Sequence, residues 1–185
     1  MKTAIALTAC ALAAGCVNSA PPAEETVAAT AATPHAAAQA FYDAVAALPV
    51  GGVPDEAGRA TLAPLVSPAL GEALDAAAAA EAAHSAATAG AEPPLAEGDL
   101  FSSLYEGPTG YTVGDCVAAG IGATCPVALV RDDSAGTTAW TDTAVVVESG
   151  EGWRLADIVY GGDWDFAAQG RLTDALAGIA AAAQP

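Results

Sequence analysis

The chain has 185 residues, which is the length of one domain with short extensions. Its 22 acidic and 5 basic residues give a formal net charge of -17, and no stretch gathers the basic residues into a patch. This excludes nucleic acid as a partner, because clustered basic side chains are needed to neutralise a phosphate backbone. It also opposes contact with anionic lipid head groups, so membrane attachment requires a covalent anchor or an apolar segment.

Residues 1–15 have the pattern of a bacterial lipoprotein signal peptide. Lys2 precedes an apolar run over residues 3–15, which suits an exported leader and is too short to span a bilayer. The run ends in Leu-Ala-Ala-Gly before Cys16, which resembles a lipobox and implies that Cys16 is lipidated and becomes the first residue of the exported protein. Val17 after the cysteine favours, by this resemblance, the outer membrane, with the chain facing the periplasm. A simple secretory signal or an uncleaved leader are the alternatives.

Three helices are expected after a tether. Residues 16–34 are rich in Ala, Pro, Glu and Thr without hydrophobic periodicity, which predicts a flexible lipidated tether. Thr33 and Ser67 each stand directly before a proline, a pair that typically caps a helix and opens its first turn. Apolar residues at helical spacing follow, until further prolines or glycines end each run. These signals place helices at residues 35–48, 54–62 and 68–87.

The C-terminal half has the pattern of a sheet. Beyond Leu95 the hydrophobic period changes to two, and β-branched and aromatic residues become frequent. Strands are expected at residues 111–118, 123–131, 138–147 and 153–160, with a final helix at 170–183. The connections are short, which predicts antiparallel neighbours. Helices followed by a sheet define an α+β fold, here a single domain over residues 35–183 with a short C-terminal helix.

The cysteines test this topology. Cys116 and Cys125 remain after export and acylation, and they are expected to form a disulfide in an oxidising compartment. If Gly120 and Ile121 make a two-residue type II′ turn, the two cysteines face each other as a non-hydrogen-bonded pair, at a Cα separation of about 4.5 Å. The same register gives Pro126 a hydrogen-bonded position without an N–H group. The ladder must therefore bulge, end or lie at an edge there.

Several segments resemble a known family. They are residues 99–107 (Asp-Leu-Phe-Ser-Ser-Leu-Tyr-Glu-Gly), 140–142 (Trp-Thr-Asp), 153–161 (Trp-Arg-Leu-Ala-Asp-Ile-Val-Tyr-Gly) and Phe166. Together they are similar to the bacterial domain of unknown function 3828, which resembles the nuclear-transport-factor-2-like superfamily. The resemblance implies N-terminal helices packed in the concave face of a curved antiparallel sheet, which forms a cone with a pocket. It says little of chemistry, because that superfamily includes isomerases, dehydratases and binding proteins.

Two aspartates are the catalytic candidates. Asp142 and Asp157 lie within strand patterns, and an unpaired carboxylate in an apolar pocket can act as a general acid or base. The alternative interpretation is that Arg154 or backbone donors satisfy them, or that they face solvent. Strand alternation puts Asp157 on the same face as Trp153 and away from Tyr160.

Four aromatic residues are candidates for the walls of a ligand pocket, and core packing is the alternative for each of them. These are Tyr42, Trp140, Trp153 and Tyr160. No histidine or acidic spacing indicates a metal site, and no phosphate-binding or dinucleotide-binding motif indicates a cofactor.

The sequence favours a non-catalytic envelope lipoprotein that is attached to the membrane through Cys16 and binds an apolar or neutral small ligand, or an envelope protein. The first alternative is an acid/base isomerase or dehydratase that uses Asp142 or Asp157. The second is an immunity or assembly factor with an acidic surface, for which a basic partner is expected.

Overall fold

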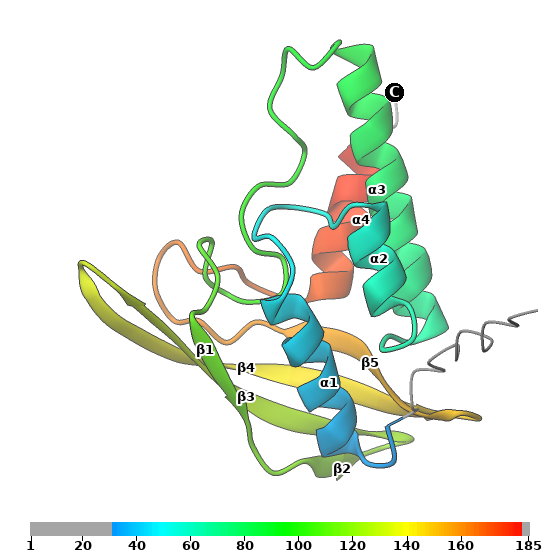
Figure 1. Ribbon diagram of the computed structural model, residues 1–185, viewed down its shortest axis with the longest axis vertical. Coiled ribbons are helices and arrows are strands. Elements are labelled where there is room, and N and C mark those ends of the chain that lie inside the picture. The colour runs from blue at the N-terminus through cyan, green and yellow to red at the C-terminus, as the bar shows by residue number, and fades with distance from the viewer. Residues whose placement is uncertain (1–30, 183–185) are drawn as a thin grey trace, which may run out of the picture.

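The computed structural model describes residues 31–182. The predicted signal peptide, the lipidation at Cys16 and the tether up to residue 30 lie outside the described residues. The described chain has the predicted α+β class, with three helices before the sheet and one after it (Figure 1). Its elements are α1 (Pro34–Ala46), α2 (Glu56–Leu62), α3 (Pro68–Ala87), β1 (Gly110–Val113), β2 (Val117–Ala119), β3 (Gly122–Asp133), β4 (Gly136–Ser149), β5 (Gly152–Val159) and α4 (Leu172–Ala182).

The helices begin at the predicted capping residues. The Thr33 hydroxyl accepts a hydrogen bond from a first-turn N–H of α1 at 3.1 Å, and the Ser67 hydroxyl does the same for α3 at 3.2 Å. Asp55 caps α2 at 2.8 Å, so the first helical residue there is Glu56. Within residues 31–182, no helix has both the length and the apolar character needed to cross a membrane.

The strands form one antiparallel sheet. Its order is β1-β3-β4-β5, and β2 pairs with β3 further along that strand. The helix α1 lies across one face of the sheet, while α2, α3 and α4 gather near β5 (Figure 1). The hydrophobic core lies between this face of the sheet and the helices, around the fully buried Phe41, Leu70 and Leu172. Burial of such large apolar side chains is the main contribution to the stability of the fold.

The strand predicted over residues 111–118 is divided into β1 and β2, because the partner strand carries Pro126 at this point. Pro126 has no N–H group to donate, and its carbonyl oxygen accepts a hydrogen bond from the Gly114 N–H at 2.8 Å in the gap between the two short strands. β1 lies one residue out of the hairpin register, so that Tyr111 pairs with Leu129. The outer ladder is therefore interrupted at the proline and resumes with β2.

The predicted cysteine hairpin is confirmed. β2 pairs with β3 in the expected register, with Ala119 opposite Gly122. Cys116 and Cys125 form a disulfide with a Cα separation of 4.1 Å. Gly120 has a φ of 60°, the left-handed value that the first position of a type II′ turn requires, and Ile121 has a negative φ.

A bulge in β5 changes which residues share a face. Val145 pairs with Asp157 and Val146 pairs with Leu155, so Ala156 is an extra residue in β5. The extra residue reverses the alternation for every residue of β5 that follows it. Leu155 therefore lies on the same face of the sheet as residues that strict alternation would place on the opposite face. The predicted placement of Asp157 on the same face as Trp153 is wrong for this reason.

The outer edge of β5 is covered by other parts of the chain. Three short segments make isolated bridges to it, one from before α1, one from before α3 and one from before α4. The bridges join Ala31 to Trp153, Val66 to Leu155 and Arg171 to Val159. The sheet is thereby tied to the start of three helices, which fixes the helices relative to the sheet.

Candidate functional site

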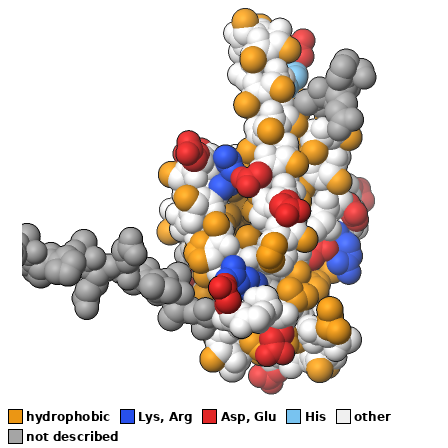
Figure 2. All heavy atoms as spheres, turned by 90° about the vertical axis from the view of Figure 1, so that its right-hand side faces the viewer, with side chains coloured by type: hydrophobic (Ala, Val, Ile, Leu, Met, Phe, Trp, Pro, Cys, Tyr) orange, Lys and Arg blue, Asp and Glu red, His pale blue; other side chains and the backbone are white. Residues whose placement is uncertain are grey.

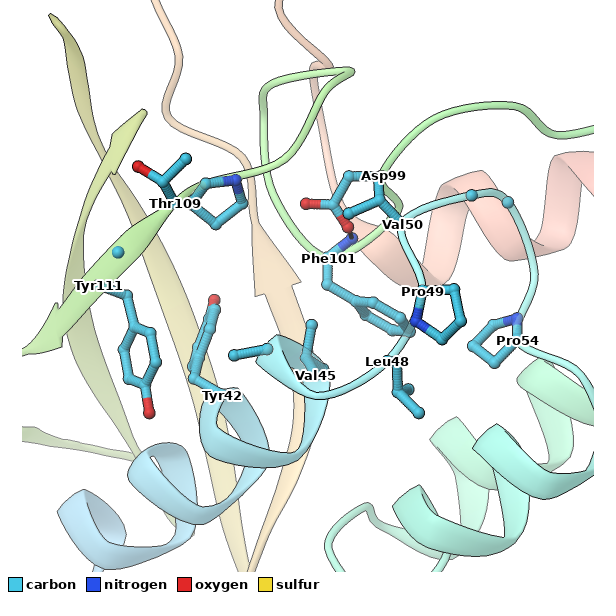
Figure 3. A pocket seen from close by; sticks show the side chains of 15 residues that line it. Tyr42, Val45, Leu48, Pro49, Val50, Pro54, Asp99, Phe101, Thr109 and Tyr111 are labelled. Carbon is cyan, nitrogen blue, oxygen red and sulfur yellow. Dashed lines mark hydrogen bonds between the residues drawn. The ribbon is translucent and has the colours of Figure 1, made fainter. Parts of the chain in front are cut away.

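A cavity of about 380 Å³ lies at the C-terminal end of α1 (Figure 3). We call it the α1 pocket. Its walls are the last turns of α1, the loop that leads to α2, residues 99–101 and the segment that enters β1. The volume is within the range of small-molecule sites, and the walls are mostly apolar, as such sites usually are. The apolar side chains are Val45, Ala46, Leu48, Pro49, Val50, Pro54, Phe101 and Pro108.

The loop after α1 is shaped by its proline and glycines. Pro49 lies just beyond the end of α1, where a residue without an N–H group cannot continue the helix. Gly52 has a φ of 59°, and a Cβ atom there would lie 2.5 Å from the carbonyl oxygen of Ala96. The Gly52 N–H donates to the carbonyl oxygen of Gly98 at 2.6 Å, so this loop is joined to the segment that carries Asp99. The two opposite walls of the pocket are thus held together by their backbones.

Tyr42 is the predicted pocket residue that the structure places in this cavity. Its side chain comes from α1, and its hydroxyl points toward the loops that carry Thr109 and Asp99 (Figure 3). The residue is 2% exposed, and its hydroxyl has no hydrogen-bond partner among the described residues. Burial, and then the negative charges of Asp142 and Asp99, hold the pKa of Tyr42 well above its usual value, so the phenol stays neutral. A buried hydroxyl without a partner costs free energy until a ligand or water binds it.

Asp99 brings a carboxylate to the same pocket. Its Oδ1 accepts from the Phe101 N–H at 2.9 Å and its Oδ2 from the Ser102 hydroxyl at 2.6 Å. Burial raises the pKa of Asp99, these two hydrogen bonds lower it, and the charge of Asp142 raises it further, with a net increase. A carboxylate has about four acceptor positions, so Asp99 retains the capacity to bind a further donor.

Tyr111 forms a fixed aromatic wall. Its hydroxyl donates to Asp43 and accepts from the Gln39 side-chain amide at 2.8 Å, so both polar contacts go to α1. Its ring lies 5.4 Å from the ring of Tyr42, with an angle of 34° between the planes. Burial and the adjacent Asp43 raise the pKa of Tyr111. Tyr111 therefore offers its ring rather than its hydroxyl to the pocket.

Asp142 lies outside the α1 pocket, in the core beneath residues 99–107. It is 0% exposed, and both of its carboxylate oxygens are occupied. One accepts from the Ser103 hydroxyl and from the Gly161 N–H at 2.8 Å, and the other accepts from the Ser103 N–H at 2.8 Å and from Trp140 Nε1 at 3.2 Å. Four donors use the acceptor capacity of this carboxylate, which joins the 99–107 loop to β4 and to the segment after β5.

Asp157 also lies away from the pocket: it belongs to β5, and its side chain contacts the start of α4. It is 6% exposed and forms an ion pair with Arg171 at 2.6 Å. It also accepts from the Thr173 N–H at 3.1 Å and the Thr173 hydroxyl at 3.0 Å, so it caps the first turn of α4. The partner is Arg171 rather than Arg154, which pairs with Glu151 at 2.5 Å.

The other predicted aromatic residues do not line the α1 pocket. Trp140 is buried in β4, where its indole N–H binds Asp142 and its ring contacts Trp164 at 5.8 Å. The Tyr160 hydroxyl donates to the Leu100 carbonyl at 2.7 Å, and Trp153 is half-buried at the start of β5. Of the four predicted pocket aromatics, Tyr42 alone lies among the residues that line this cavity.

The sequence did not single out Asp99, Phe101 or Tyr111 as pocket residues. Asp99 and Phe101 lie in the loop before β1, whose path no local pattern determines, and Tyr111 lies in β1 itself. One signal was present: Asp99 stands two residues before Phe101 and three before Ser102, a spacing at which an aspartate folds its own loop around its carboxylate. Among residues 31–182, no group of three or more His, Cys, Asp or Glu side chains is placed to hold a metal ion.

Comparison with known proteins gives no relative from which a role could be carried over: no family model, no curated protein and no solved structure matches the chain.

Proposed function

We propose that this protein is an envelope lipoprotein, anchored through Cys16 in the outer membrane and facing the periplasm, that binds a small and largely apolar ligand in the α1 pocket without transforming it. The domain would belong to the cone-shaped, nuclear-transport-factor-2-like type that its sequence resembles. The observation that carries the proposal is the Tyr42 hydroxyl, which is buried without a partner among the described residues beside a mostly apolar cavity.

The contacts of the two candidate catalytic acids support binding rather than catalysis. Asp142 already accepts four hydrogen bonds, and Asp157 is neutralised by Arg171. A general base needs a free lone pair within reach of the substrate, and neither carboxylate lines the α1 pocket. An isomerase or dehydratase that used either one would have to break a cluster that holds the fold together.

The test fills the pocket from its exposed rim. Ala46 lines the cavity and is exposed, so Ala46→Trp occupies the space at little expense to the core. Ala47→Trp is the matched control, because Ala47 is also exposed and does not line the cavity. The full chain carrying Cys16→Ser would be exported and purified without detergent, which could otherwise occupy the pocket.

Octanol is a suitable probe, because it combines an apolar chain with one hydroxyl. Titration calorimetry should show that octanol binds the parent chain and the Ala47→Trp chain equally, and the Ala46→Trp chain at least about tenfold more weakly. Equal binding to Ala46→Trp, or no binding to the parent chain, would reject the pocket as the ligand site. Native mass spectrometry of the same material would identify the class of any ligand that co-purifies.

A further inference from the structure

The polar groups of the α1 pocket indicate which chemical class of ligand it takes. Asp99 has two donors and spare acceptor capacity, and the Tyr42 oxygen has no partner among the described residues. Both residues line the same cavity, and each oxygen atom can accept a hydrogen bond. A neutral carbonyl group could satisfy Tyr42, but it has no donor for Asp99. A ligand with several N–H donors matches both.

The arginines do not neutralise Asp99. Each of the four pairs with another acid. On the face shown in Figure 2, the basic side chains lie beside acidic ones. The pairs are Arg59 with Asp75, Arg131 with Asp133, Arg154 with Glu151 and Arg171 with Asp157. Arg131 contacts the loop near Asp99, but through the carbonyl oxygens of Glu106 and Gly107. In the part of the chain that the structure describes, Asp99 therefore has no cationic partner.

The groups behind the pocket strengthen its negative potential. Asp142 and Asp99 each raise the pKa of Tyr42, and they do the same to Tyr160. The two carboxylates thus lie close enough to both phenols to influence them, and within residues 31–182 no ion pair joins a cation to either carboxylate. In a site with low-dielectric walls this potential repels anions and attracts cations.

The apolar walls exclude a bare metal ion as the preferred cation. Metal ions such as Ca²⁺ and Mg²⁺ need six or more oxygen ligands or ordered waters, whereas the pocket offers one carboxylate among apolar side chains. The rings of Tyr42, Phe101 and Tyr111 also line it, and aromatic faces attract organic ammonium groups.

We propose that the α1 pocket binds an organic cation, in which a protonated amine donates to the Asp99 carboxylate and the Tyr42 hydroxyl oxygen while an apolar body contacts Val45, Leu48 and Phe101. This inference rests on the proposed function and specifies its ligand class. Asp99 also folds its own loop, but that role uses only two of its acceptor positions. The remaining acceptor capacity and the partnerless phenol are what the amine would occupy.

The experiment compares three probes with the same chain and different head groups: octylammonium, octanol and octanoate. They are titrated into the full chain carrying Cys16→Ser at neutral pH. Because a hydrogen bond to a charged group is stronger than one between neutral groups, octylammonium should bind at least about tenfold more tightly than octanol. Octanoate should show no measurable binding.

Two variants locate the effect. Asp99→Asn keeps one oxygen that can accept the Phe101 hydrogen bond, places an NH2 group next to the Ser102 hydroxyl, and removes the charge. It should therefore abolish the advantage of octylammonium over octanol. Asp163→Asn removes one charge from an exposed position outside the pocket and should preserve that advantage. Should Asp99→Asn fail to fold, the comparison of the three probes on the parent chain still decides the question.

The outcomes separate the two proposals. If octanol binds as tightly as octylammonium, the pocket is real and the ligand is not a cation. If the advantage of octylammonium survives in Asp99→Asn, the preference comes from the overall negative charge, and the inference about this site is wrong. If no probe binds, the proposed function fails together with the inference.

Discussion

Two carboxylates bind donors of the 99–107 loop, and they differ in how many hydrogen bonds they accept. The difference distinguishes an acid that holds the fold together from one that can bind a ligand. Asp142, behind the loop, is fully buried and accepts four hydrogen bonds. Asp99, in front of it, accepts two and faces a cavity. Both lack a cationic partner among the described residues. A buried acid whose acceptors are all used holds parts of the chain together, whereas one with free capacity can bind a ligand.

Two tyrosines show the same contrast. The Tyr160 hydroxyl donates to Leu100 at 2.7 Å and is part of the folded network. The Tyr42 hydroxyl is as deeply buried and has no partner in the described chain. The two residues have the same side chain, so the effects of removing their hydroxyls on the free energy of unfolding can be compared directly. This allows the comparison to be tested with small substitutions.

The largest effect is expected at Asp142. Asp142→Ala leaves the Ser103, Gly161 and Trp140 donors buried without an acceptor, and each such group costs about 1–3 kcal/mol. We therefore expect a loss of at least about 3 kcal/mol in the free energy of unfolding, measured by urea denaturation. Asp142→Asn, which keeps one acceptor oxygen, should lose less. A loss below about 1 kcal/mol for the alanine variant would contradict the structural role.

The disulfide should affect stability without affecting the pocket. Replacing Cys116 and Cys125 by serine releases a loop of ten residues, which should lower the free energy of unfolding by about 2.5 kcal/mol. The disulfide joins the segment before β2 to β3. The pocket is lined by the C-terminal end of α1 and by the start of β1. Octanol affinity in the folded variant should therefore be unchanged. A parallel loss of affinity would show that the two regions are coupled.

The two tyrosines should respond differently to loss of their hydroxyls. Tyr160→Phe leaves the Leu100 carbonyl unpaired and should cost about 1 kcal/mol. Tyr42→Phe removes a group that has no partner to lose, so stability should stay the same or rise, while affinity for octylammonium falls. Thermal unfolding of both variants alongside the parent measures the difference. Equal destabilisation by both substitutions would mean that the Tyr42 hydroxyl has a partner in solution.

The smallest expected effect is the pH dependence of Asp99. Its raised pKa means that the folded protein holds this proton more strongly than the unfolded chain does. The free energy of unfolding should therefore rise as pH falls through the raised pKa, and this contribution levels off below the ordinary value of about 3.9. Asp99→Asn should remove this part of the pH dependence without lowering stability at neutral pH.

Asp133 should have the opposite effect on the pH dependence of stability. Its pKa is lowered, mainly by the Ala135 N–H and in part by Arg131, so its contribution to stability is lost as pH falls. Asp133→Asn should therefore change the slope of stability against pH in the other direction. Urea unfolding across acidic to neutral pH compares the two variants, and equal slopes would argue against a desolvated Asp99.

Local chemistry explains which parts of the fold could be predicted. The caps at Thr33 and Ser67 and the hairpin register between Cys116 and Cys125 depend on residues only a few positions apart, and they are confirmed. The bulge at Ala156 was missed because alternation assumes that every residue has a partner. The division of the first strand was anticipated only as one of several consequences of Pro126.

The candidate site was harder to predict, because it depends on donors that are distant in the chain. Asp142 receives its hydrogen bonds from a serine 39 residues earlier and a glycine 19 residues later, so sequence alone could not tell a satisfied acid from a free one. Tyr42 was predicted as one of several pocket aromatics and lines the α1 pocket, but nothing in the helical pattern shows that its hydroxyl lacks a partner. Asp99 lies in a loop whose path is determined by contacts with Gly52 and Asp142.

The edges of the sheet have a consequence for how molecules of this protein meet at high concentration. A long, exposed strand edge invites neighbouring molecules to add strands, which is a route to aggregation. Here one edge carries the bridges from Ala31, Val66 and Arg171, and the other is divided at Pro126 into strands of four and three residues. Molecules at high local concentration would thus meet through an acidic surface rather than through open strands, and would remain separate.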